Sequence, residues 1–344
     1  MVASLGAGGP ARAADRLFRR LLGSPAVYDA FHFDHLRPGT RLALVAERAG
    51  VARAAPGVAD RLAAELGAEP IELVISVFAT GAGVAARLRA AGRCRRSVVF
   101  VPDSTAHRMW VHERTDLFLV TSRLGAASVR RYRPDAPVEI LAPPLRAEFA
   151  DPPTRGDARR ALGLPDEAEV VLLMGGAWGL GPVVEVAAGL ADSGRHVIAV
   201  AGRNQALLAS LRAAAADRSR LVPVGLTAAV AEAMAAADLV VTTAGMTCHE
   251  ARAVGRGLVL LDVVPGHGRE NLAHELELGA AAVAQAEARS VVSAVDEALA
   301  SPEMRDPPPT DARAARRRLL EVVGTLVGPG PGAGGSLGPR VRPD

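Results

Sequence analysis

The sequence contains no lysine, so each of its 40 basic residues is an arginine. The arginines are scattered and are balanced by 37 acidic residues, which leaves a net charge of +3 without a basic block. A nucleic-acid partner is therefore not expected, although the isoelectric point lies near 9.4. Aromatic residues make up only 3% of the chain, so its cores must be built from Ala, Val and Leu.

Cysteine is equally scarce, and Cys94 and Cys248 fit neither a disulfide framework nor a metal-ligand spacing. His32, Asp34 and His35 resemble a metal cluster, but no further ligand is placed nearby, and we interpret them as loop residues. Neither a metal nor a cofactor is expected. No apolar run reaches the length of a membrane span, and the N-terminus does not resemble a secretory signal. These absences predict a reduced, cytoplasmic protein.

One N-terminal segment has a pattern that is compatible with membrane contact. Leu17, Phe18, Leu21 and Leu22 would form one face of a helix that four arginines surround, namely Arg12, Arg16, Arg19 and Arg20. Such a pattern is typical of an amphipathic helix packed on a sheet. It also suits peripheral binding to an anionic surface, such as the inner face of the plasma membrane.

Short β-branched runs alternate with helical patterns along most of the chain, which predicts parallel sheets of the α/β class. Strands are expected at 71–77, 97–101, 117–121, 169–174, 196–201, 221–224, 239–241 and 257–261. At 344 residues, a chain of two domains is expected. A proline-rich break at 141–167 divides them into 1–143 and 144–326. The Gly/Pro-rich tail, 327–344, is expected to be disordered.

The stretch 237–271 carries two polar turns, each at the C-terminal end of an expected strand. Thr247 is predicted to cap the helix after the first turn. Glu250 is then expected in the first turn of that helix, where a carboxylate can bind the vicinal diol of a ribose. The alternative is that Glu250 only complements the helix dipole.

Five turns of the second half should lie along one sheet edge, where open α/β sheets bind their ligands. They begin at Gly175, Gly202, Gly225, Gly245 and Gly266. Glycines in the first of these turns allow backbone amides to approach a phosphate at a helix N-terminus. The spacing is not the GxGxxG of a dinucleotide-binding domain, and no ribose acid follows the second strand.

The order of these turns resembles that of the family-28 glycosyltransferases, in particular the monogalactosyldiacylglycerol synthases and processive diacylglycerol glucosyltransferases. The resemblance rests on the Gly-rich loop, Gly202-Arg203-Asn204, Gly225-Leu226-Thr227, Gly245-x-Thr247-x-x-Glu250-Ala251 and Pro265-Gly266-x-x-x-x-Asn271, and covers about residues 71–285. It implies a GT-B fold, with two Rossmann-like domains facing across a cleft. The first domain would bind the acceptor and the second a UDP-sugar.

The resemblance also implies roles for individual residues. The diphosphate would face Gly175, Gly176, Gly179 and Gly181, the nucleotide would lie near Arg203 and Asn204, and the uracil would lie beside Leu226. Glu250 would hold the ribose hydroxyls, and Gly245 and Thr247 of the same motif would also belong to the donor-binding site. Phosphate and donor sugar would contact Gly266, His267, Glu270 and Asn271. On the acceptor side, Asp103 would be the base, with His107 four residues on to orient it or the acceptor.

Three departures accompany these matches. Gly9 or Pro10 stands where the family has an N-terminal His, and His267-Gly268 replaces a Gln-Glu pair. Residues 26–60 do not match the lipid-acceptor segment, so the acceptor need not be diacylglycerol. Asp103 is as well suited to cap a helical turn at 105–109 as to act as a base.

The sequence therefore predicts a UDP-sugar-dependent hexosyltransferase that acts on a lipid or other hydroxylated acceptor without metal or cofactor. The missing His leaves open a degenerate, non-catalytic protein that binds nucleotide sugars. A UDP-sugar 2-epimerase on the same fold is a further alternative.

Overall fold

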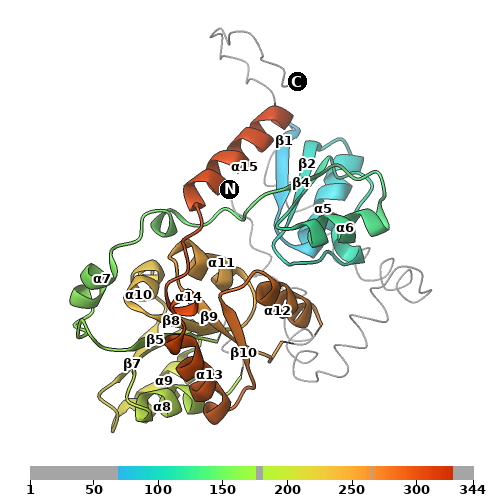
Figure 1. Cartoon of the computed structure of the whole chain (residues 1–344). Coiled ribbons are helices and arrows are strands. Elements are labelled where there is room, and N and C mark those ends of the chain that lie inside the picture. The colour runs from blue at the N-terminus through green and yellow to red at the C-terminus, as the bar shows by residue number, and fades with distance from the viewer. Residues whose placement is uncertain (1–68, 176–180, 265, 328–344) are drawn as a thin grey trace.

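The computed structural model describes residues 69–175, 181–264 and 266–327 (Figure 1). They form two separate sheets, one of four strands in the order β1-β2-β3-β4 and one of six in the order β10-β9-β8-β5-β6-β7. All recorded strand pairs are parallel, which confirms the predicted α/β class. The predictions for Arg12–Leu22, for His32–His35, for Gly9 and Pro10 and for the tail after residue 327 lie outside the described residues.

The first sheet has three strands where the β-branched runs predicted them and a fourth, β4, that was not predicted. Its strands are β1 (Ile71–Ser76), β2 (Cys94–Val101), β3 (Leu117–Val120) and β4 (Val138–Ile140). Between them lie α5 (Ala79–Ala90), the 3-10 turn η4 (Arg108–Trp110) and α6 (Arg123–Tyr132). Ser122 caps α6, because its hydroxyl accepts a hydrogen bond from the amide of Gly125. The loop between β2 and η4 carries Asp103, at the C-terminal end of a central strand.

A connecting segment with η5 (Ala147–Phe149) and α7 (Arg155–Ala161) leads to the second sheet. Its strands are β5 (Val170–Met174), β6 (His196–Gly202), β7 (Leu221–Gly225), β8 (Leu239–Thr242), β9 (Gly257–Leu261) and β10 (Ala281–Ala284). The helices are α8 (Val183–Asp192), α9 (Gln205–Ala215), α10 (Val230–Ala236), α11 (Met246–Ala253), α12 (His267–Glu277), α13 (Ala288–Ala300) and α14 (Pro302–Arg305). Helices lie on both faces of this sheet (Figure 1).

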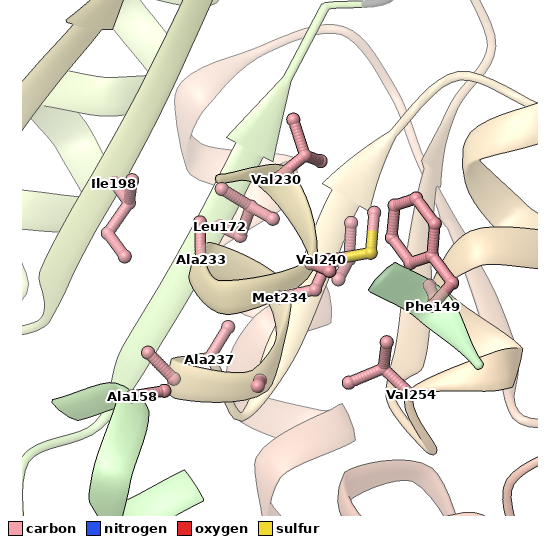
Figure 2. Close-up of a cluster of buried hydrophobic side chains, with 14 of the residues drawn as sticks. Phe149, Ala158, Leu172, Ile198, Val230, Ala233, Met234, Ala237, Val240 and Val254 are labelled. Carbon is pink, nitrogen blue, oxygen red and sulfur yellow. The ribbon is translucent and has the colours of Figure 1, made fainter. Parts of the chain in front are cut away.

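Small aliphatic side chains fill the interior of the second sheet, as the low aromatic content requires. One face packs Leu172, Val240 and Met234 of α10 together with Phe149 from the connecting segment (Figure 2). The opposite face packs Val171, Val241 and Leu190 of α8, with the helix α13. Because both faces are covered, the strands read as continuous apolar runs rather than alternating ones.

The last helix, α15 (Ala312–Val327), leaves the second sheet and returns to the first (Figure 1). Its Val322 is buried with Val98, Phe100 and Leu119 of the first sheet. The predicted second domain, 144–326, therefore ends in a helix whose apolar face belongs to the core of the other sheet. Between residues 69 and 327, the chain passes from one sheet to the other after β4 and again before α15.

Candidate functional site

The five predicted turns share one edge of the second sheet. They follow β5, β6, β7, β8 and β9, and these strands pair in parallel, so their C-terminal ends lie together. The chain runs from β5 outward to β6 and β7, and then returns to place β8 on the other side of β5. This reversal makes a topological switch point between β5 and β8, which is where open α/β sheets bind ligands.

The Gly-rich loop lies directly at this switch point. Gly175 is buried at the end of β5, whereas Gly176 and Gly179 lie outside the described residues. Gly181 has a φ of 88°, and a Cβ there would lie 3.3 Å from Cγ1 of Val263, so both the backbone conformation and the space favour glycine. No side chain caps the helix α8 that follows. A phosphate at this loop would face the positive end of that helix.

The next two turns contribute one capping residue and one exposed apolar side chain. The Oδ1 atom of Asn204 accepts a hydrogen bond of 3.0 Å from the amide of Leu207, so Asn204 caps α9. If Asn204 also contacts a nucleotide, as predicted, it must do so while its Oδ1 atom keeps this hydrogen bond. Arg203 is exposed, and Leu226, after β7, is 68% exposed. Both could contact a ligand on this edge.

The helix of Glu250 starts earlier than the sequence predicted. Gly245 is the N-cap of α11 and Met246 its first residue, so the prediction that Thr247 caps the helix is wrong. Thr247 lies inside the helix because the extended backbone of the turn ends at Gly245. We had expected Glu250 in the first turn of the helix, and this prediction is also wrong. Glu250 therefore has no first-turn interaction with the helix dipole.

Glu250 lies instead opposite the segment that connects the two sheets. Its side chain is 18% exposed, and its Oε1 atom is 3.8 Å from Nη2 of Arg146. Burial raises the pKa of Glu250, Arg146 lowers it, and Glu148 raises it. Arg146 also pairs with Glu148 at 2.8 Å and lies over the ring of Phe149. No sequence motif indicated Arg146, because it precedes Glu250 by about a hundred residues.

The turn after β9 brings the second polar group. Gly266, with a φ of 62°, precedes α12, which begins at His267. A Cβ at Gly268 would lie 2.4 Å from Cβ of Val264, so local packing favours glycine there. Glu270 lies in the first turn of α12, and Asn271 is 6% exposed.

Three hydrogen bonds, which we call the interdomain clasp, join α12 to the loop after β2. The Nδ2 atom of Asn271 donates to Oδ1 of Asp103 at 3.0 Å, and the amide of Ser104 donates to Oδ1 of Asn271 at 2.8 Å. The hydroxyl of Thr105 donates to Oε2 of Glu270. The structure thus brings the predicted base together with two residues that the sequence assigned to the donor.

The alternative for Asp103, a helix cap, is wrong. The 3-10 turn η4 begins at Arg108, its N-cap is His107, and no side chain caps it. The ring of His107 packs 6.1 Å from that of Trp110. The amide of Asn271 holds the carboxylate of Asp103, and the orienting role of His107 stays a prediction.

A small polar cavity lies beside the clasp, between the two sheets. It measures about 10 Å³ and is lined by Pro102, Ser104, Thr121, Gly245, His249, Asn271, His274 and Glu275. Such a volume accommodates about one water molecule. The Oγ atom of Ser104 is buried without a protein partner, and burial lowers the pKa of His249. Sequence reasoning missed Ser104, His249 and His274, which carry no family motif.

Among residues 69–175, 181–264 and 266–327, no three His, Cys, Asp or Glu side chains are arranged to hold a metal ion. Within the same ranges, no helix combines the length and apolar character needed to cross a membrane.

The curated relatives of this chain include two kinds of diacylglycerol glycosyltransferase. Processive diacylglycerol beta-glucosyltransferase of Bacillus subtilis is 30% identical over 200 residues, which are 57% of this chain and 52% of the relative. Monogalactosyldiacylglycerol synthase 1 of Arabidopsis thaliana is 28% identical over 227 residues, 60% of this chain and 42% of the relative. The chain resembles the diacylglycerol glycosyltransferases. It spans about half the length of these curated relatives. No family model matches the sequence.

Solved structures show the fold of this chain. MurG of Acinetobacter baumannii superimposes with a TM-score of 0.53 at 16% identity, over 80% of this chain and 78% of that one. A UDP-N-acetylglucosamine 2-epimerase gives 0.53 at 15% identity, over 89% and 85%. The fold is GT-B, as the resemblance implied. Because an epimerase shares it, the fold alone does not distinguish glycosyl transfer from epimerisation.

Proposed function

We propose that this protein transfers a sugar from a UDP-sugar to a lipid or other hydroxylated acceptor. The observation that carries the proposal is a contact between the predicted acceptor side and the predicted donor side of the site. Asp103, after a central strand of the first sheet, contacts Asn271 at the ligand-binding edge of the second. The predicted base for the acceptor and the turns predicted to bind the donor then face each other across the interface between the two domains.

In the proposed reaction, the carboxylate of Asp103 takes the proton of the acceptor hydroxyl, and the oxygen attacks the anomeric carbon of the donor. The bond between that carbon and the diphosphate breaks, and UDP leaves. Backbone amides of the Gly-rich loop and the N-terminus of α8 would stabilise the charge on the departing diphosphate. The carboxylate of Glu250 would hold the ribose hydroxyls. The proposal requires no metal, and turnover should persist in EDTA.

The test is release of UDP from a panel of UDP-sugars, with and without a cellular lipid extract. The proposal expects release that depends on the extract, together with a new glycolipid by mass spectrometry. The replacement of the family's N-terminal His by Gly9 or Pro10 favours a second candidate, a non-catalytic nucleotide-sugar-binding protein. UDP binding without release under every condition would support that candidate. Isomerisation of a UDP-sugar without an acceptor would identify an epimerase.

We further propose peripheral membrane contact through the basic segment Arg12–Leu22. Electrostatic attraction to anionic lipid weakens as salt screens the charges, so vesicle binding should fall with ionic strength. Co-sedimentation with vesicles that contain phosphatidylglycerol tests this at low and high salt. Binding that is absent, or that does not depend on salt, would contradict it.

A further inference from the structure

Asn271 lies at a junction that its predicted donor role does not explain. It projects from α12, whose N-terminal turn belongs to the ligand-binding edge of the second sheet, yet its side chain contacts the first domain. Both heteroatoms of its amide are hydrogen-bonded to the loop of Asp103. The residue is 6% exposed, so leaving either bond unmade would cost free energy.

The two hydrogen bonds fix which way the amide points. A backbone N–H can only donate, so the amide of Ser104 requires the oxygen of Asn271. The NH₂ group is then turned toward Asp103, and an ionised carboxylate can only accept. Neither Asp nor Leu at this position could satisfy both partners. An asparagine satisfies both, because its oxygen accepts from the backbone amide and its NH₂ group donates to the carboxylate.

From this geometry we propose that Asn271 is a positioning residue for Asp103. The Asn271 amide donates to Oδ1 of the Asp103 carboxylate and leaves Oδ2 free to accept the proton of the acceptor hydroxyl. Both hydrogen bonds of Asn271 join one domain to the other. The carboxylate of Asp103 is therefore held only when the two domains lie against each other as in this structure. The inference rests on the proposed function and reassigns Asn271 from the donor to the acceptor side of the reaction.

Glu270 supports this assignment independently. Its carboxylate accepts from the hydroxyl of Thr105, two residues after Asp103. Consecutive residues of α12 thus hold the loop at two points, which limits both rotation and translation of the Asp103 carboxylate. A reacting group misplaced by about 1 Å can lose roughly a hundredfold in rate, so such restraint has a kinetic consequence.

The experiment compares full-length wild-type protein with Asn271→Ala, Asn271→Asp and a control, Glu277→Ala, at an exposed position near the end of the same helix. Three quantities are measured: amide hydrogen exchange at Ser104, the Kd for UDP, and kcat and KM for the UDP-sugar. For Asn271→Ala we expect faster exchange at Ser104 and a kcat lowered by roughly tenfold or more, with Kd and KM within about twofold.

The aspartate variant separates the two hydrogen bonds. Its carboxylate can still accept from Ser104, so exchange should stay closer to the wild-type rate. It cannot donate to Asp103 and places a like charge against it, so kcat should fall at least as far as in Asn271→Ala. The control should match the wild type in all three measurements.

Several outcomes would overturn the inference. Unchanged exchange at Ser104 in Asn271→Ala would mean that the clasp does not form in solution. A weakened Kd with unchanged kcat would return Asn271 to the donor site. If the wild type turns over and kcat of Asn271→Ala is unaffected, this inference alone fails. If the wild type binds UDP but never turns over, the proposed function and this inference fail together.

Discussion

Arg146 lies 3.8 Å from Glu250, so the segment that connects the two sheets supplies a counter-charge to the predicted ribose-binding acid. Burial raises the pKa of Glu250, and Arg146 opposes that effect. The ionised carboxylate accepts from ribose hydroxyls better than the protonated acid does. UDP affinity should therefore fall as the pH drops through the raised pKa. Calorimetric titration across pH 4.5–8 measures this.

Two substitutions should move that transition in opposite directions. Arg146→Ala removes the favourable charge and should shift the loss of affinity to higher pH. Glu148→Gln removes the like charge and should shift it to lower pH. A UDP analogue without the ribose diol serves as the control, since its affinity should not respond to Glu250→Ala. Equal losses for UDP and the analogue would show that Glu250 does not hold the ribose.

The same shift has a consequence for folding. A carboxyl whose folded pKa is raised binds its proton more readily in the folded than in the unfolded state. The contribution of Glu250 to stability is therefore fully present below the unfolded pKa and is lost as the pH rises through the folded one. Glu250→Gln should remove this component from the pH dependence of urea unfolding.

Asp103→Asn should abolish turnover while leaving UDP affinity unchanged. The substitution keeps an oxygen that can accept from Asn271 but removes the basicity, and a general base contributes on the order of a hundredfold or more. The donor contacts lie on the other sheet. Initial rates of UDP release and a UDP titration measure the two effects. Substantial remaining activity would place the base elsewhere.

Gly268→Ala should disturb the turn at the start of α12. The new methyl group would lie 2.4 Å from Cβ of Val264, and overpacking of this kind typically costs ~1–3 kcal/mol. Because Cβ and Cγ1 of Val264 are the obstacle, at 2.4 and 2.5 Å, Val264→Gly in the same protein removes both atoms and should restore part of the loss. Gly324→Ala is the matched control, since no atom lies within 4 Å of its Cβ position. Thermal melts and UDP titration report the effect.

Asp238→Asn should destabilise the second domain. The carboxylate is fully buried and accepts hydrogen bonds from Arg159 at 2.8 Å, Arg305 at 3.0 Å and the amide of Val170. Breaking a buried charge network costs ~3–5 kcal/mol, because the remaining charges stay desolvated. Urea denaturation measures this loss. Asp192→Asn, at an exposed ion pair with Arg218, should change stability little.

The parts of the site that follow strand order could be predicted from the sequence. Parallel strands and short turns place Gly175, Gly202 and Gly245 at one edge whatever the details of packing. The N-cap of α11 was misplaced by two residues, because Thr247 is a better intrinsic cap than Gly245, but the extended backbone at Gly245 sets the boundary. Local propensity was outweighed there by the geometry of the turn.

Contacts between the domains could not be predicted in the same way. Asp103 and Asn271 are 168 residues apart, and each had a sufficient local explanation, one as a base or cap and the other as a donor contact. Arg146 resembles any other surface arginine in a chain whose 40 basic residues are all arginines. Both relationships depend on how two separately folded sheets meet, which no local pattern encodes.

The return of α15 to the first sheet makes the two halves mechanically dependent on each other. Within the described residues two covalent connections join them, one after β4 and one before α15. A protein cut before Ala312 would lose the second connection together with the helix that buries Val98, Phe100 and Leu119.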